Sequence, residues 1–207
     1  MERRMMMNMR ERALSGKLFD AHCEELTAIK HRAHNLCQDY NAAREDDPAR
    51  QELIRQIVGG IGEGSYFQGP IQFNYGCNTT VGAHCYFNFN LTVLDDAPIV
   101  IGDHAMIAPN VSLMASSHPL LWQEREQLVY PDGHVSMSEL AKGITIGDHV
   151  WIAAGCIVCG GVTIGDGAVI AAGSVVTKDI PAGYLAWGNP CRPVRPITEA
   201  DSRLSFL

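Results

Sequence analysis

Hydrophobic positions along the second half of the chain return every six residues. From Ile146 to Val176, each hexad begins with a β-branched residue, usually followed by Gly or Ala, with a small residue four places on. The first half shows the same period, with apolar residues at Ile61, Phe67, Phe73, Val81, Phe87, Val93, Ile101, Ile107 and Leu113. The steps from 73 to 81 and from 93 to 101 are longer, so two extra residues enter after every third repeat.

This slip predicts a three-sided coil with three hexads to a turn and the extra pair at one corner. Each hexad supplies a short strand whose apolar residue points inward, while Gly, Asn or Asp makes the turn. Successive turns stack about 4.8 Å apart and form parallel sheets on three faces. The sequence therefore predicts a mainly β protein, a parallel β-helix of hexapeptide repeats over residues 61–196.

The flanking segments follow other patterns. Residues 1–60 carry a helical stripe from Leu26 to Tyr40 and a second one that begins at Asp47-Pro48, read as N-cap and first helical residue, and ends at Gly59-Gly60. We expect a small N-terminal helical segment packed on the first coil. Residues 116–143 interrupt the repeat and predict one protruding loop, and repeated prolines end the coil before a tail at residues 197–207.

Composition and charge narrow the class of protein. Apolar residues make up 46% of the 207 residues, enough for a buried core, and the formal charge is −7. This balance argues against a partner that is nucleic acid or an anionic membrane held by bulk charge. No apolar run approaches the roughly 18–20 residues that cross a bilayer, and the first ten residues do not resemble a signal peptide. We expect a cytoplasmic protein.

The seven cysteines form an odd set, which favours free thiols in a reducing compartment. Cys156 and Cys159 have the spacing of half a zinc site or a redox pair, but no second such pair accompanies them. We interpret the cysteines as small core residues.

Eight histidines are candidates for chemistry. His84, His104 and His149 occupy the fourth place of their hexads, which predicts turns at one corner of successive coils, where they either face water or bind a metal. His22, His31 and His34 fall in the helical segment and are expected to be exposed, and His134 gives no information. His118 lies where the repeat stops, and Pro119 favours an extended backbone at His118. It suits a general base, the alternative being a surface or loop-packing histidine.

Several blocks resemble one family. They are Tyr86-Phe-Asn-Phe-Asn-Leu-Thr-Val-Leu-Asp-Asp96, Ser117-His-Pro119, Thr177-Lys-Asp-Ile-Pro181 and Gly188-Asn-Pro-Cys-Arg192, together with the N-terminal Gly16-Lys-Leu-Phe19 and Tyr40-Asn41. The chain resembles, over nearly its whole length, the galactoside/maltose O-acetyltransferase group of the hexapeptide-repeat acyltransferases. The resemblance implies a left-handed parallel β-helix, a homotrimer with sites between subunits, and acetyl-CoA as acetyl donor with no metal.

The resemblance also implies roles for individual residues. His118 matches the catalytic base. The positions that match acceptor-binding residues are Asn74, Tyr86, Asn88 and Asp96. Those that match the binding region for acetyl-CoA are Trp151, Ala154, Ala172, Thr177, Lys178, Arg192 and Arg195. Two positions depart from the family pattern: Ala21 stands where an acceptor-binding Asp is common, and Asn74 where relatives carry Ser or Asp.

The resulting expectation is an acetyl-CoA-dependent O-acetyltransferase acting on a hydroxyl of a sugar or glycoside. Three alternatives remain at this point. The acceptor could be an antibiotic or a lipo-oligosaccharide, the same fold could carry a histidine-zinc hydratase, or the β-helix could be a non-catalytic scaffold.

Overall fold

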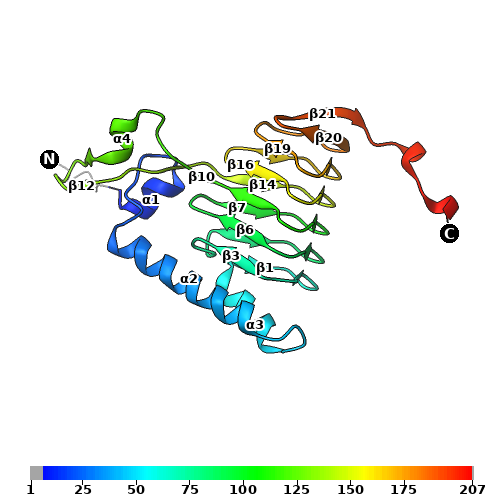
Figure 1. Ribbon diagram of the computed structural model, residues 1–207, viewed down its shortest axis with the longest axis horizontal. Helices are drawn as coiled ribbons and strands as arrows, with labels where there is room; N and C mark the ends of the chain where they lie inside the picture. Colours follow the sequence, from blue (N-terminus) through cyan, green and yellow to red (C-terminus); the bar gives the residue numbers. More distant parts are fainter. Residues whose placement is uncertain (1–6, 207) are drawn as a thin grey trace.

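The expected parallel β-helix is confirmed by the computed structural model, which describes residues 7–206 (Figure 1). The first six residues, which begin the expected helical segment and the peptide judged not to be a signal sequence, lie outside the described residues, as does Leu207. Three sheets run along the coil, parallel except at the last strand of one of them, and the chain visits them in a fixed order. We number these faces first, second and third, and each corner by the face that it follows.

The strands of each face lie in register. The first face contains, in spatial order, β1 Gly60–Ile61, β4 Thr79–Val81, β7 Ile99–Ile101, β14 Ile144–Ile146 and β17 Thr163–Ile164. The second face contains β2 Tyr66–Phe67, β5 Tyr86–Phe87, β8 Met106–Ile107, β15 Trp151–Ile152, β18 Val169–Ile170, β20 Tyr184–Gly188 and β21 Cys191–Pro196. The third face contains β3 Ile71–Phe73, β6 Leu91–Leu94, β9 Ser112–Met114, β16 Ile157–Cys159 and β19 Val175–Val176.

The register explains the two lengths of repeat. Early turns use 20 residues, as when Tyr66 pairs with Tyr86, whereas later turns use 18, as when Thr145 pairs with Thr163. The extra pair enters at the third corner, between β3 and β4 and again between β6 and β7. The loop leaves from this same corner, between β9 and β14.

Apolar side chains fill the inside of the coil, as the hexads predict. Phe67 and Phe87, one turn apart, stack with ring centroids 4.0 Å apart, and Phe73 meets Phe67 edge-on. Cys37, Cys85, Cys156 and Cys191 are buried, as predicted, and Cys23 and Cys77 are partly buried and pack against the core. Cys159 is half-exposed outside this core, so the interpretation as a core residue is wrong for Cys159. All seven are free thiols.

Three helices precede the coil: α1 Met9–Leu14, α2 Glu24–Ala42 and α3 Ala49–Ile57. Helix α2 packs on the first turn and on α3, whereas α1 contacts α2 and the inserted loop. Helix α2 buries Leu26, Ala33, Cys37 and Tyr40, the stripe expected from the sequence. The start of α3 differs by one position from the prediction. Pro48 is the N-cap, and Asp47 accepts a hydrogen bond from the Ala49 N–H, because a short aspartate side chain reaches back to the second amide after it.

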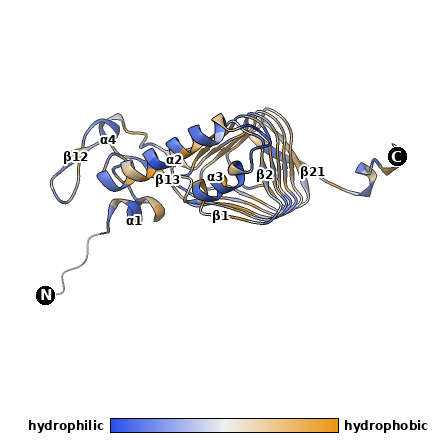
Figure 2. Cartoon of the chain, turned by 90° about the horizontal axis from the view of Figure 1, so that it is seen from below, coloured by the Kyte–Doolittle hydropathy of each residue, from blue (hydrophilic) through white to orange (hydrophobic). Residues whose placement is uncertain are grey.

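The inserted loop has secondary structure of its own. It contains β10 Ser116–Ser117, α4 Trp122–Glu126, β11 Leu128–Val129, β12 Val135–Ser136 and β13 Leu140–Ala141. β10 pairs antiparallel with β13, and β11 with β12. The loop and the C-terminal tail, with the short helices η1 Glu199–Asp201 and η2 Leu204–Phe206, leave the coil on opposite sides (Figure 2). None of the helices in residues 7–206 is long and apolar enough to cross a membrane.

Candidate functional site

The third corner of the coil carries two adjacent aspartates with different tasks. Asp95 is fully buried and accepts hydrogen bonds from the backbone N–H groups of Tyr75, Gly76 and Asn78 and from the Thr79 hydroxyl, at 2.8–3.3 Å. It satisfies the donors that the extra residues leave open on the turn below. Asp95 is therefore the structural residue of this corner, a task that its neighbour does not share.

Asp96 faces Asn74 instead. The Asn74 Nδ2 lies 3.1 Å from both carboxylate oxygens of Asp96. Asp96 itself is only 1% exposed. Burial, reinforced by the negative charge of Glu139, raises the pKa of Asp96 to about 7, although the hydrogen bond from Asn74 opposes the shift. The structure thus brings two predicted site residues together, but it closes the Asp96 carboxylate off from solvent behind Asn74.

This burial predicts a pH-dependent effect of Asp96→Asn on stability. The folded-state pKa is raised above the ordinary aspartate value of 3.8, so the favourable contribution of Asp96 to stability is complete below pH 4 and is lost as the pH rises towards 7. The uncharged asparagine avoids this loss. We expect the variant to melt at about the parental temperature at pH 4 and several degrees above it at pH 8. At pH 8 this corresponds to a gain in the free energy of unfolding on the order of 2 kcal/mol. Thermal melts of both proteins across this range test the sign, and an equal difference at every pH would contradict it.

His118 is exposed and lines a cleft where the loop joins the coil. The cleft has a volume of about 450 Å³ and is also lined by Leu140, Lys142, Cys159 at the end of β16 and Gly160 at the third corner. The His118 Nδ1 lies 3.4 Å from the carbonyl oxygen of Ser138. A carbonyl oxygen can only accept, so this contact favours the tautomer with the proton on Nδ1 and leaves Nε2 free to take a proton.

Thr177 and Lys178 lie on the same corner, one turn beyond the cleft. Val158 pairs with Val176, so Thr177 and Lys178 follow at the positions that Cys159 and Gly160 hold one turn earlier. Both are exposed, and Lys178 forms no ion pair within residues 7–206. A single corner thus carries Asn74, Asp96, His118, Thr177 and Lys178 of the predicted residues.

A second group lies elsewhere on the chain. Tyr86 and Trp151 lie on the second face, one on each side of Met106, with which both pair in register. Together with Asn88 they line a small hollow. Asn88 begins the second corner, where its Oδ1 accepts a hydrogen bond from the Phe89 N–H. The third face separates this group from His118, so one chain does not bring all predicted site residues together.

The second corner also presents unused backbone donors. Ala154 and Ala172 are exposed on successive turns, where the Gly173 N–H donates to the Ala154 carbonyl at 2.9 Å. Among the described residues, no acceptor receives the N–H of either alanine. These two groups could bind the amides of an extended ligand or stabilise a developing negative charge.

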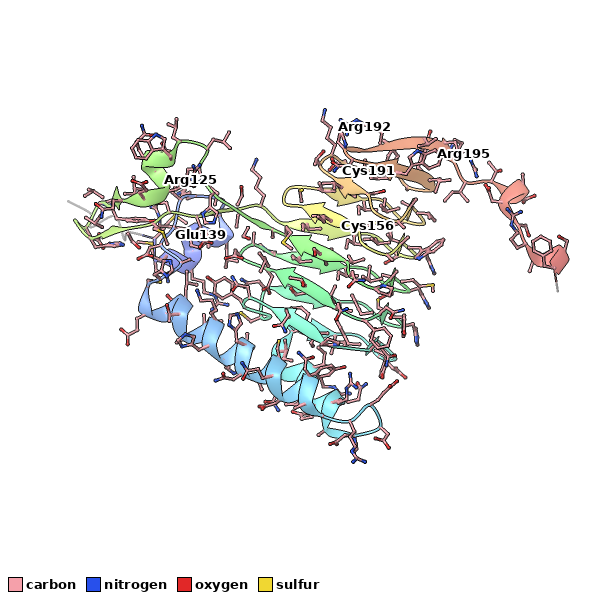
Figure 3. The ribbon with its side chains drawn as sticks, viewed as in Figure 1. Arg125, Glu139, Cys156, Cys191, Arg192 and Arg195 are labelled. Carbon is pink, nitrogen blue, oxygen red and sulfur yellow. The ribbon has the colours of Figure 1, made fainter. Side chains whose placement is uncertain are left out.

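The two predicted arginines near the end of the coil differ in their environments (Figure 3). Arg192 is exposed on β21, where its guanidinium donates to the Cys191 carbonyl at 2.7 Å. Arg195 forms a two-pronged ion pair with Asp201 at 2.6 and 2.8 Å, which raises its pKa and lowers that of Asp201. Arg192 is thus more available than Arg195 to an anionic ligand.

The corner predicted for three histidines is confirmed. The rings of His84, His104 and His149 form a stack at the first corner, with centroids 5.0 and 4.8 Å apart. Rings stacked face to face do not direct their nitrogens to a common point. Within residues 7–206, no group of three or more His, Cys, Asp or Glu side chains is arranged to hold a metal ion. His22, His31 and His34 are exposed, as predicted.

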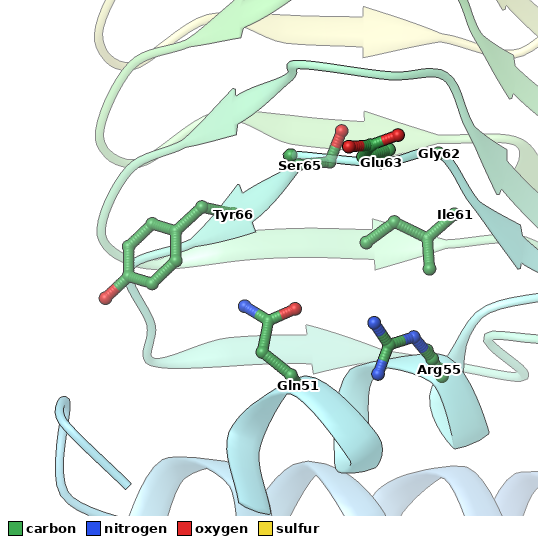
Figure 4. Close-up of a pocket in the computed structure, with 8 residues that line it drawn as sticks. Gln51, Arg55, Ile61, Gly62, Glu63, Ser65 and Tyr66 are labelled. Atoms are coloured by element: carbon green, nitrogen blue, oxygen red, sulfur yellow. The ribbon is translucent and has the colours of Figure 1, made fainter. Parts of the chain in front are cut away.

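Two residues that the sequence reasoning passed over join the loop to the N-terminal segment. Asp20 is buried, and its carboxylate lies 3.3 Å from the Nε2 of His134. The polar stretch with Pro131-Asp-Gly133 belongs to the predicted protruding loop, but no signal along the chain connected that loop with residue 20. A separate groove between α3 and the first coil, lined by Gln51, Arg55 and residues 61–66, contains none of the predicted residues (Figure 4).

Comparison with known families and proteins agrees with this fold and these motifs. Residues 12–62 match the family model described as the maltose acetyltransferase hexapeptide capping motif, and residues 143–178 match that of the bacterial transferase hexapeptide in six repeats. The chain is 39% identical over 206 residues to the galactoside O-acetyltransferase of Escherichia coli strain K12, covering 98% of this chain and 96% of the relative.

Solved structures show the same likeness over most of the chain. A galactoside acetyltransferase in complex with coenzyme A is 40% identical, with a TM-score of 0.86, covering 95% of this chain and 94% of the other. A hexapeptide-repeat acetyltransferase from Vibrio cholerae O1 biovar eltor, complexed with acetyl coenzyme A, is 34% identical with a TM-score of 0.81, covering 93% and 100%.

Proposed function

Because the chain belongs to the galactoside/maltose O-acetyltransferase family of hexapeptide-repeat acyltransferases, we propose that it acetylates a sugar or glycoside hydroxyl with His118 as general base. Acetyl-CoA is the acetyl donor, in keeping with the coenzyme in the related structures. The observation that carries the role of His118 is its place in the cleft, with Nδ1 beside the Ser138 carbonyl and Nε2 free.

In the proposed reaction, the Nε2 of His118 removes the proton of the acceptor hydroxyl as its oxygen attacks the thioester carbonyl carbon. The C–O bond forms, the C–S bond breaks, and the proton passes from His118 to the departing thiolate. The products are the O-acetylated sugar and the free thiol of CoA. No covalent enzyme intermediate is needed, so the cysteines are not required as nucleophiles. Burial in fact raises the pKa of Cys156, which disfavours its thiolate.

The separation of the predicted residues over two corners supports a site built from two chains. We propose a homotrimer in which the third corner of one subunit, with His118, faces the second corner of its neighbour. The free Ala154 N–H would then stabilise the oxyanion of the tetrahedral intermediate. The free Ala172 N–H one turn on would bind the pantetheine arm. Exposed apolar side chains on the second face, Met106 and Trp151 among them, supply surface for such a contact.

We assign the acceptor end to Asn74, Tyr86, Asn88 and Asp96. Asp96 holds the Nδ2 of Asn74, which turns the Asn74 Oδ1 away from the aspartate as an acceptor for a sugar hydroxyl. Ala21 is buried and its side chain has no polar group, so the proposed site offers the acceptor one hydrogen-bonding side chain fewer than the family pattern does. We therefore propose broad, weak use of simple hexoses and glycosides. The free thiols support a cytoplasmic location.

An acceptor panel tests the reaction directly. Purified protein with acetyl-CoA is offered galactosides, maltose, glucose and their deoxy analogues, and thiol release is measured beside the mass of the acetylated product. We expect turnover with several sugars at high KM, and loss of turnover when the acetylated hydroxyl is missing. Product formation only from an antibiotic or a lipo-oligosaccharide would overturn the sugar assignment. If calorimetry detected no binding of acetyl-CoA, the assignment as an acetyl-CoA-dependent enzyme would be overturned.

The basic residues near the end of the coil give a second prediction. Replacing Lys178 and Arg192 by alanine should raise the KM for acetyl-CoA on the order of 10-fold and leave the sugar KM nearly unchanged, because both are exposed cations that we propose as contacts of the phosphates. High salt should shrink the difference by screening these contacts. The double variant Arg44→Ala, Arg55→Ala removes the same charge at the other end of the coil and serves as control. Equal effects on both substrates would contradict cofactor recognition.

A further inference from the structure

Asp20 is a buried carboxylate whose partners come from distant parts of the chain. The residue is 6% exposed, and its Oδ1 accepts hydrogen bonds from the His22 N–H and the Ser136 hydroxyl, each at 2.8 Å. The Oδ2 lies 3.3 Å from the Nε2 of His134. A buried carboxylate is costly unless it is hydrogen-bonded or paired, so these contacts couple the N-terminal segment to the β11–β12 hairpin.

Contacts within the loop connect the β11–β12 hairpin to Ser138, near the coil. The ring of His134 stacks on that of Tyr130, with centroids 4.4 Å apart and an interplanar angle of 4°. Tyr130 is 2% exposed, and its hydroxyl lies 3.0 Å from the Oγ of Ser138, a fully buried residue. Ser138 is thus held by a side chain that rests directly on His134.

Ser138 in turn meets the proposed base. Its carbonyl oxygen is the group that lies 3.4 Å from the His118 Nδ1. The next residue, Glu139, exchanges backbone hydrogen bonds of 3.1 and 3.0 Å with Phe19, the neighbour of Asp20. Residues 19–20 therefore touch both the hairpin and the segment ahead of β13 that carries the carbonyl beside His118.

We propose that Asp20 is a positioning residue for His118. Through His134 and Ser136 it holds the β11–β12 hairpin in the place where Tyr130 and Ser138 fix the tautomer and orientation of the His118 ring. Its burial keeps it from touching substrate. The inference rests on the proposed role of His118 as base. It gives the N-terminal segment a part in the reaction that does not involve contact with the acceptor.

A positioning role affects the chemical step more than ground-state binding. A ring that is free to turn aligns its Nε2 with the acceptor hydroxyl in only a fraction of encounters, and small misplacements of catalytic groups are costly. Acetyl-CoA binding depends on residues at the second and third corners outside this hairpin. A lower kcat with an unchanged KM for acetyl-CoA is therefore the expected signature.

The test removes the contacts from the loop side, because Asp20 also accepts from the His22 N–H ahead of α2. We expect the double variant His134→Ala, Ser136→Ala to lower kcat on the order of 10-fold with little change in melting temperature or in the KM for acetyl-CoA. His134→Gln keeps a donor near the position of Nε2 and also keeps Ser136, so its kcat should stay within about threefold of the parent. Val135→Ala, an exposed neighbour on β12, is the matched control and should behave as the parent.

Asp20→Ala should show the same loss of kcat with an additional fall in melting temperature. Parental kcat in the double variant, or a kcat of His134→Gln as low as that of the double variant, would overturn the positioning role. If His118→Ala also kept parental kcat, the failure would belong to the proposed base and not to Asp20. A loss in the double variant without change in kcat upon His118→Ala would likewise reject an effect transmitted through His118.

Discussion

His118→Ala should leave a folded protein that binds acetyl-CoA with parental affinity and turns over about 10²–10⁴-fold more slowly. General-base catalysis contributes rate factors of this size, and alanine has no group that can accept the hydroxyl proton. His118 is exposed at the cleft, and its Nδ1 contact with the Ser138 carbonyl is long at 3.4 Å, so we expect the fold to survive its removal. Thiol release gives the kcat, calorimetry the affinity for acetyl-CoA, and thermal melts the integrity of the fold.

His149→Ala is the control for this experiment. It also removes an exposed histidine, but from the stack at the first corner, away from the cleft. We expect parental turnover from this control. If His118→Ala also kept parental turnover, His118 would be rejected as the general base, and another group at the third corner would have to take that role. A loss of acetyl-CoA affinity equal to the loss of kcat would indicate that His118 acts in binding.

Asp95→Ala should be the most destabilising single change at the third corner. Four donors on the turn below point at this carboxylate, three of them buried and one partly buried, and its removal leaves them without this acceptor. Each orphaned donor costs about 1–3 kcal/mol, but neighbouring effects do not add, so we expect a loss on the order of 3 kcal/mol. For a protein of this size, that corresponds to a fall of roughly 6–12 °C in melting temperature.

Asp103→Ala is the matched control for this stability prediction. Asp103 is an exposed corner aspartate whose carboxylate accepts a hydrogen bond from the Ala83 N–H at 2.7 Å. We expect it to cost less than about 1 kcal/mol, because water can replace the lost acceptor. Equal destabilisation by the two changes would show that Asp95 does not hold the corner. Asp96→Asn provides a contrast in sign, since it is expected to stabilise the protein at pH 8.

The coil could be predicted because its period is only six residues long and is therefore visible in short stretches of the sequence. Each hexad places one apolar residue inside, and the steps from Phe73 to Val81 and from Val93 to Ile101 marked the corner that receives the extra pair. The structure places these residues in register on the predicted faces. The same arithmetic predicted that His84, His104 and His149 share a corner, which their stacked rings confirm.

The roles at the third corner were harder to predict. Asp95 and Asp96 are adjacent and chemically identical, and the resemblance to the family singled out only the second. Their backbone directions at the turn send one carboxylate towards four donors below and the other towards Asn74. The cause is the geometry of the stacked turn. An alternation of side chains along a strand does not extend into an irregular corner, so the sequence pattern could not assign the two tasks.

By itself, then, the sequence determined the coil, its three faces, the place of the loop and the candidate base, because short-range periodicity dictates which side chains point inward. Only the tertiary structure decided that Asp20 meets His134 and Ser136 across more than a hundred residues, that Asp96 is closed off behind Asn74, and that the predicted residues occupy two corners. Those contacts depend on how the loop folds back on the N-terminal segment and on which turns lie side by side. A pairing between segments so distant along the chain leaves no periodic trace in either one.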